Sequence, residues 1–325
     1  MKQINLKAYA KINLAIDVLG KLPSGYHEVS MIMQQIELHD KVSVKWIPIE
    51  EHLVQNQILQ SDEKEAVNKR ALADNPGSIM IEINSNKRFL PKDERNLAYK
   101  AAQLIIERFD IVTKMGPGKI RIDMKKQIPV GAGLGGGSAD CAAVLHGLSR
   151  IFRLNIKLAE LCELGAELGS DVPFCIMGQA GRNAALAEGT GTELTEIQGI
   201  DSWLVLSKPP ISVSTAEVYK GFGEIPYKNL ERPDIKQLIN DMPKGDFELI
   251  SKNIVNVLEK FTLTAYPSVM YTKNKMKSET DSLKVVMSGS GPTIVGFYAN
   301  KESAQIAYEE MLQINKETFL TKTKG

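Results

Sequence analysis

The chain has 325 residues, a length at which two domains of about 100 to 200 residues each are the usual arrangement. Its hydrophobic content of 43% and charged content of 24% are typical of a soluble globular protein. The 40 basic and 39 acidic residues leave a formal net charge of +1, which gives no electrostatic reason to expect nucleic acid or an anionic membrane as the main partner.

The three cysteines, Cys141, Cys162 and Cys175, lack the spacing of a metal site or a redox motif. We interpret them as reduced, buried thiols of a cytoplasmic protein. The N-terminal segment alternates polar and apolar residues, so it predicts neither a signal peptide nor a membrane span. The expected location is therefore the cytoplasm.

Strands are expected at the start of the chain. From Ile4 to Val18 the apolar residues alternate, which is the period of a half-buried strand. The opposite face of that strand then carries Lys11, Asn13, Ala15 and Asp17. Residues 22–28 have turn chemistry, and two further strands, 29–38 and 40–46, are expected to join at His39 and Asp40.

Residues 47–78 are highly charged and close with Asn-Pro-Gly, so we interpret them as a surface insertion. Between this insertion and residue 170, periodicity predicts strands at 79–84 and 119–126 and helices at 96–109, 138–152 and 157–169. A change in composition near 191–201 predicts a boundary between domains at 1–198 and 199–325. In the second domain we expect strands at 202–209, 284–288 and 293–299 and helices at 247–261 and 303–312.

The stretch from Ile128 to Asp140, IPVGAGLGGGSAD, is unusually rich in glycine. Gly131, Gly133 and Gly136 have the GxGxxG spacing of dinucleotide-binding folds, but a helix is expected where those folds place a second strand. A Walker A motif is excluded because the loop has no lysine. Bare backbone N–H groups and the start of a helix expected at Ser138 favour an anion, and the natural ligand is a polyphosphate.

Four motifs along the chain resemble those of the GHMP kinase superfamily. The glycine stretch resembles its phosphate loop, and LGSDVPFCI (168–176) and SGSGPTIVGFY (288–298) resemble two further motifs. AKINL (10–14) followed by GYHE (25–28) resembles one branch, which phosphorylates a cytidine-diphosphate-linked methylerythritol. The motifs occur in the expected order and span most of the chain.

The resemblance implies an α+β fold of two domains, a ribosomal-S5-like N-terminal domain that binds ATP and a ferredoxin-like C-terminal domain. It implies ATP as the co-substrate, Mg²⁺ as the metal, and phosphorylation of the 2-hydroxyl of 4-diphosphocytidyl-2-C-methyl-D-erythritol in non-mevalonate isoprenoid synthesis. The expected partner is this small molecule, with no nucleic acid and no membrane, and the protein is expected to be a monomer or a homodimer.

Asp171 and Lys11 match the catalytic residues of the resembled branch. Phosphoryl transfer to an alcohol needs a group that accepts the hydroxyl proton, and Asp171 fits this role. It also needs positive charge near the transferred phosphate, and Lys11 fits that role. Taken alone, Asp171 would be a turn or capping residue and Lys11 would lie on a solvated strand face. Asn13 shares the face of Lys11 and is expected to bind substrate.

The other expected binding residues follow from the same resemblance. ATP phosphates are assigned to Pro129, Val130, Gly131, Ala132, Gly133, Leu134, Gly135, Gly136, Gly137, Ser138 and Ala139. Adenine is assigned to Asn96 and Leu97, although Asn96 is also a good helix N-cap. Substrate is assigned to Tyr26, His27, Tyr219, Gly289, Ser290 and Gly291. No side chain is predicted as a metal ligand.

Two alternatives remain open at this point. A related kinase acting on homoserine, mevalonate or a sugar would need the phosphate loop but would have no use for Tyr26 and His27. A non-catalytic nucleotide sensor on the same fold would be expected to lack Asp171 or Lys11, and the chain has both.

Overall fold

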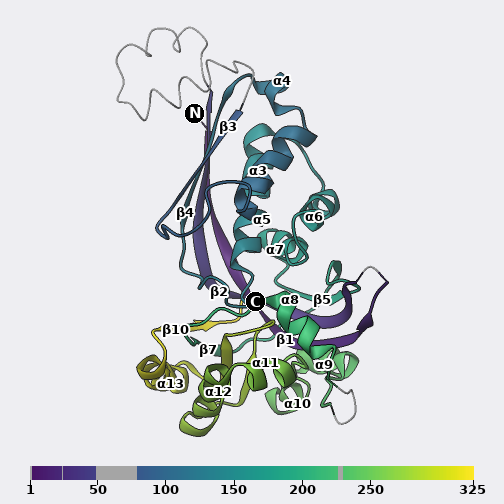
Figure 1. The fold of residues 1–325 in the computed structure, drawn as a ribbon, viewed down its shortest axis with the longest axis vertical. Coiled ribbons are helices and arrows are strands. Elements are labelled where there is room, and N and C mark those ends of the chain that lie inside the picture. Colours follow the sequence, from purple (N-terminus) through teal and green to yellow (C-terminus); the bar gives the residue numbers. More distant parts are fainter. Residues whose placement is uncertain (1, 24, 49–78, 226–229) are drawn as a thin grey trace. The chain divides into compact units, whose positions relative to one another are not determined.

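The structure, a computed structural model, describes residues 2–23, 25–48, 79–225 and 230–325 (Figure 1). The chain forms two compact units that interleave along the sequence. The first draws on residues 1–8, 40–126 and 137–172, and the second on residues 9–39, 127–136 and 173–325. Strands β1 (Lys2–Lys21) and β2 (His27–Pro48) contribute to both. Since both units use residues before 198, the domain boundary expected there stays a prediction.

The first unit combines a sheet with helices. β4 (Gly118–Lys125) pairs antiparallel with the second half of β2 and parallel with β3 (Ile79–Ser85), and β1 pairs with β2. The parallel pair needs a crossover, which α3 and α4 supply. The helices of this unit are α3 (Leu97–Arg108), α4 (Ile111–Met115), α5 (Gly136–Phe152) and α6 (Leu158–Ala166).

Small residues let α5 lie close to this sheet. A Cβ atom added to Gly147 would lie 3.1 Å from Val44 Cγ2 and 3.3 Å from Leu6 Cδ1. The ring of Trp46 covers Gly118, and its centroid lies 5.3 Å from that of Phe152. The helix-facing side of the sheet is therefore a packed core.

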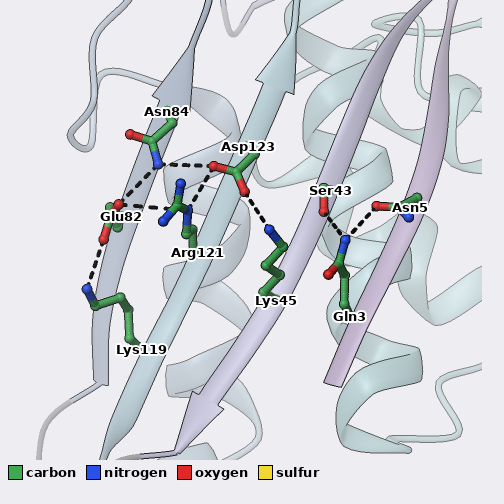
Figure 2. A network of polar contacts seen from close by, with 9 residues as sticks. All are labelled: Gln3, Asn5, Ser43, Lys45, Glu82, Asn84, Lys119, Arg121 and Asp123. Atoms are coloured by element: carbon green, nitrogen blue, oxygen red, sulfur yellow. Dashed lines mark hydrogen bonds and ion pairs between the residues drawn. The ribbon is translucent and has the colours of Figure 1, made fainter. Parts of the chain in front are cut away.

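The other side of the sheet is polar. Figure 2 shows a chain of contacts there across neighbouring strands: Lys119 pairs with Glu82 at 2.9 Å, and Asp123 accepts hydrogen bonds from Arg121 at 2.9 Å and Lys45 at 3.2 Å. These side chains remain partly exposed, and ion pairs in that setting contribute about 0–1 kcal/mol each. Buried and half-buried residues alternate along β4, as expected for the half-buried strand at 119–126.

The second unit contains an antiparallel sheet in the order β10, β7, β9, β8. Its strands are β7 (Trp203–Lys208), β8 (Lys284–Met287), β9 (Ile294–Tyr298) and β10 (Glu317–Lys322). Helix α12 (Pro267–Glu279) precedes β8, and α13 (Lys301–Ile314) precedes β10. This is the β-α-β-β-α-β order of a ferredoxin-like unit, with further helices inserted before α12.

The second unit also contains two short strands and several helices. β5 (Ala184–Glu188) pairs with the first half of β2 and with β6 (Glu193–Glu196). The helices are α7 (Val172–Gln179), α8 (Thr215–Phe222), α9 (Ile235–Asp241), α10 (Phe247–Lys252), α11 (Glu259–Ala265) and the short 3₁₀ helix η1 (Met242–Lys244). Among the described residues, no helix is long and apolar enough to cross a bilayer.

The expected break at His39 and Asp40 is wrong, because β2 is one continuous strand. Asp40 is fully buried and pairs with Lys126, so its charge is satisfied without a turn. The first strand is also not half-buried, since both faces are covered from Ala10 to Val18. Of the insertion expected at 47–78, Ile47 and Pro48 belong to β2 and the rest lies outside the described residues.

The helix expected at 247–261 is two helices, α10 and α11. The backbone between them pairs instead with β1, where Ile16 N–H donates to Val255 O at 2.9 Å and Val257 N–H donates to Ile16 O at 3.1 Å. Helix α5 begins at Gly136, two residues before the expected Ser138.

Candidate active site

Lys11 and Asn13 are buried on β1, so neither lies on a solvated face. Lys11 Nζ donates a hydrogen bond to Asn13 Oδ1 at 2.8 Å, and Asn13 Nδ2 lies 3.4 Å from Met31 Sδ. The backbone N–H of Lys11 donates to Leu134 O at 3.0 Å, which ties this strand to the glycine loop. Lys11 thus places a buried positive charge on the strand that is bonded to the glycine loop.

The glycine loop has a backbone that only glycine adopts easily. Gly131, Gly133 and Gly135 have φ angles of +62°, +72° and +66°. At Gly133 space is also lacking, because an added Cβ would lie 2.3 Å from Ser288 O and 3.0 Å from Gly291 O. Gly133 therefore combines a left-handed conformation with close backbone packing.

The stretch 288–293 packs directly on this loop. Ser288 Oγ donates to Gly133 O at 3.0 Å, and a Cβ added to Gly289 would lie 3.1 Å from the same oxygen. The stretch is also a tight turn between β8 and β9, closed by the Gly291 N–H to Ser288 O hydrogen bond of 3.0 Å. The structure thus brings the two glycine-rich segments of the sequence together.

Helix α8 connects this turn with the expected base-binding residues. Ser290 Oγ lies 2.9 Å from Thr215 Oγ1 in the first turn of α8, whose N-cap is Ser214. The same helix carries Tyr219, and the ring centroids of Tyr219 and His27 are 5.2 Å apart with the planes tilted by 37°. Tyr26 beside them is 69% exposed, which leaves its ring face open to a ligand.

His27 is suited to act as a neutral ring. Its partial burial lowers its pKa, and the positive charge of Lys21 lowers it further. At neutral pH the imidazole then offers one donor and one acceptor, which matches the edge of a pyrimidine. Which ring nitrogen carries the proton depends on the ligand.

The first unit holds the remaining expected residues. Gly137, Ser138 and Ala139 form the first turn of α5, and Leu97 Cδ1 lies 3.8 Å from the position of a Cβ on Gly137. Asn96 caps α3, because its Oδ1 accepts from Ala98 N–H at 3.0 Å and its Nδ2 donates to Pro91 O at 2.8 Å. Asp171 is half-buried in the turn before α7, where Val172 N–H donates to Gly169 O at 3.1 Å.

A buried ionic cluster that the sequence did not predict flanks the glycine loop. Lys126, which precedes the loop, pairs with both Asp40 and Asp140, and Asp140 lies in the first turns of α5. Burial raises the pKa of Asp140 to about 7; Lys126 lowers it and Asp40 raises it. Because the ion pair of Lys126 with Asp140 joins residues on either side of the loop, it fixes the separation of the loop's ends.

Other contributors were missed because their role is visible only in three dimensions. Thr215 contacts Ser290, and Ser212 Oγ lies 3.2 Å from the position of a Cβ on Gly131. Asp17, on the face of β1 that carries Lys11, is paired with Arg232 at 2.8 Å. The three cysteines are thiols rather than disulfides, Cys141 and Cys175 are buried, and burial raises the pKa of the Cys141 thiol.

Among the described residues there is no cluster of three or more histidine, cysteine, aspartate or glutamate side chains that could hold a metal ion. A magnesium ion in a nucleotide site is usually held by one or two protein oxygen atoms together with substrate phosphates. The Ser138 hydroxyl, in the first turn of α5, would supply an oxygen of this kind. The residues present therefore fit an ion that arrives with a nucleotide.

Comparison with known proteins places these features in a family. Residues 96–179 match the GHMP kinases N-terminal domain, and residues 234–316 match the GHMP kinases C-terminal domain. A 4-diphosphocytidyl-2-C-methyl-D-erythritol kinase from Clostridium botulinum strain Eklund 17B is 40% identical over 321 residues, covering 98% of this chain and 100% of the relative. One from Alkaliphilus metalliredigens is 39% identical over 325 residues, covering 99% and 97%.

Solved structures agree with the sequence comparison. A crystal structure of 4-(cytidine 5'-diphospho)-2C-methyl-D-erythritol kinase matches with a TM-score of 0.74 and 25% identity, covering 99% of this chain and 100% of the other. The mevalonate kinase of L. major (TM-score 0.70, 14% identity, covering 99% and 96%) and the homoserine kinase of Cytophaga hutchinsonii (0.65, 17%, covering 99% and 95%) share the fold. These matches confirm the expected two-domain α+β architecture.

Proposed function

Because the chain belongs to the 4-diphosphocytidyl-2-C-methyl-D-erythritol kinase family of the GHMP kinases, we propose that it phosphorylates this compound at its 2-hydroxyl with ATP. This reaction belongs to non-mevalonate isoprenoid synthesis. The observation that supports this acceptor, beyond family membership, is the His27 ring, whose centroid lies 5.2 Å from that of Tyr219. Tyr219 lies on the helix whose first turn contacts Ser290. A kinase for homoserine or mevalonate has no base to bind there.

The glycine loop would bind the phosphates of ATP through backbone N–H groups and the N-terminus of α5. Adenine would lie near Asn96 and Leu97; because the Asn96 side chain caps α3, its contact with the base would be through remaining lone pairs or backbone. Mg²⁺ bound to the phosphates, with Ser138 as a protein ligand, would offset their charge.

For the chemical step we assign proton acceptance to Asp171 and charge stabilisation to Lys11. Asp171 would orient the 2-hydroxyl and accept its proton as the oxygen attacks the terminal phosphorus of ATP, whose bond to the bridging oxygen breaks so that ADP leaves. Lys11 would stabilise negative charge on the transferred group, and its hydrogen bond to Asn13 fixes the direction of the ammonium. The Asn13 amide nitrogen, one N–H of which faces Met31 Sδ, would keep its second N–H for the acceptor.

The cytosine would bind between the rings of the second unit. His27 would hydrogen-bond the edge of the base, while Tyr26 and Tyr219 would pack on its faces. Gly289 and Ser290 would approach the acceptor's diphosphate through backbone N–H groups, and Gly291, whose N–H donates to Ser288 O, would hold the turn beside it. Buried, reduced thiols at Cys141 and Cys175 favour a cytoplasmic location for this activity.

The decisive experiment is ADP release by the purified protein with Mg-ATP, offered the cytidylyl acceptor and, separately, homoserine, mevalonate and galactose. We expect turnover with the cytidylyl acceptor alone. Turnover with another acceptor would refute the assignment of the base pocket. Nucleotide binding without turnover on any acceptor would support the sensor alternative instead.

A further inference from the structure

A cavity of about 330 Å³ in the second unit lies beside the strand that leads into the 288–293 turn. Its walls come from α12, from the start of β8 and from residues 254–259. Three lysines line it, Lys273, Lys277 and Lys284, together with the carboxylates of Glu231 and Glu259. None of these residues belongs to the ATP or acceptor sites described above.

The three lysines lie close together around this cavity, and repulsion between their positive charges is unfavourable. Lys273 and Lys277 are four residues apart on α12, a spacing at which like charges weaken a helix. Lys284 is half-buried, and within the described part of the chain no carboxylate lies within ion-pair distance of its ammonium. Burial lowers the pKa of Lys284; Lys273 and Lys277 act in the same direction, whereas Glu231 and Glu259 oppose it.

The carboxylate of Glu259 is already engaged in holding the neighbouring turn. Its Oε1 accepts from Met287 N–H at 2.7 Å, and its Oε2 pairs with Lys273. Asn256, in the same wall, donates to both Met287 O and Gly289 O at 2.8 Å. The wall of the cavity therefore supports the backbone that packs on Gly133.

We propose that this cavity is a second anion site, which binds a small molecule bearing a phosphate or diphosphate group through Lys273, Lys277 and Lys284. Its volume is at the lower end of the range of ligand pockets, which suits such a group and a short substituent. An anion there competes with Glu259 for Lys273, and the Glu259 hydrogen bond to Met287 is altered in turn. An anion bound in the cavity thus alters the backbone at Gly289 and Ser290. The effect of this change on turnover rests on the function proposed above.

The binding test uses pyrophosphate as the probe and isothermal titration calorimetry as the readout. The full chain is first saturated with a non-hydrolysable ATP analogue, so that pyrophosphate does not report the glycine loop. We compare the unmodified protein with Lys284→Met, Lys277→Ala and the control Lys275→Ala, a residue of α12 that pairs with Glu279 and does not line the cavity. Lys277 is exposed, so its variant is expected to fold normally.

We expect pyrophosphate to bind the unmodified protein and the control with equal affinity. Its affinity for each of the other two variants should be lower by about 10-fold or more, the effect of losing a charge-assisted hydrogen bond. No binding beside the ATP analogue, or equal affinity in all four proteins, would overturn the proposal. If the protein binds no ATP analogue, the proposed function fails, yet the same comparison without nucleotide still tests this cavity.

The coupling to the turn is tested by hydrogen exchange. Pyrophosphate should speed exchange of the Met287 amide in the unmodified protein and in Lys275→Ala, but not in Lys284→Met. Unchanged exchange at Met287 in a protein that binds pyrophosphate would overturn the coupling.

Discussion

Gly133→Ala tests whether the two glycine-rich segments depend on each other. At its φ of +72° an alanine costs about 1–2 kcal/mol. The new Cβ would also lie 2.3 Å from Ser288 O, and the backbone shifts that relieve such overlap typically cost about 1–3 kcal/mol. The free energy of unfolding should therefore fall by about 2–5 kcal/mol relative to the unmodified protein.

Gly245→Ala is the matched control, because its φ is +70° and nothing lies within 4 Å of an added Cβ. It should lose only the conformational part, about 1–2 kcal/mol. Both variants are unfolded in urea, and their KM values for the acceptor are measured. Gly133→Ala should also raise KM for the acceptor, since the displaced backbone includes Ser288 to Gly291. Equal losses of stability in the two variants, with unchanged KM, would refute the dependence of one segment on the other.

Three further predictions address the reaction and the buried ionic cluster. Asp171→Asn should bind ATP normally in a nucleotide titration but turn over about 100-fold or more slowly; near-normal turnover would exclude Asp171 as the base. His27→Ala should raise KM for the cytidylyl acceptor and leave KM for ATP unchanged, and the opposite pattern would contradict the base pocket. Asp140 has a pKa raised from 3.8 to about 7 in the fold, so the native state holds the extra proton between these values and its stability falls as the pH rises through them. The free energy of unfolding in urea should fall over this pH range in the unmodified protein but not in Asp140→Asn. Parallel pH profiles of the two proteins would exclude this role of Asp140.

Local patterns predicted the elements whose causes are local. The helix at 96–109 was expected from its apolar spacing and from Asn96, and the structure has both the helix and the cap. The strand at 119–126 follows from the alternation of apolar and polar residues, and buried and half-buried residues alternate along β4. The two glycine-rich segments stood out by composition, and both adopt left-handed backbone conformations that glycine permits.

Elements determined by distant partners were not predictable in this way. Asp40 resembles a turn residue until Lys126, 86 positions away, neutralises it inside β2. Residues 253–258 have a helical pattern, yet pairing with β1 at Ile16 outweighs helix propensity. Thr215 carries no signal of its own, because its contact with Ser290 depends on how α8 packs.

The position of Gly133 explains why so much of this loop is bare backbone. A phosphate cradle alone requires N–H groups that converge on an anion, and several residue types supply those. Here the side of Gly133 that a Cβ would occupy is filled by the carbonyls of Ser288 and Gly291, and Ser288 Oγ bonds to its oxygen. Glycine at 133 therefore serves the contact between two loops, one assigned to ATP and the other to the acceptor. A change in either loop is therefore transmitted to its neighbour through the backbone contacts of Gly133 with Ser288 and Gly291 and through the Ser288 hydroxyl.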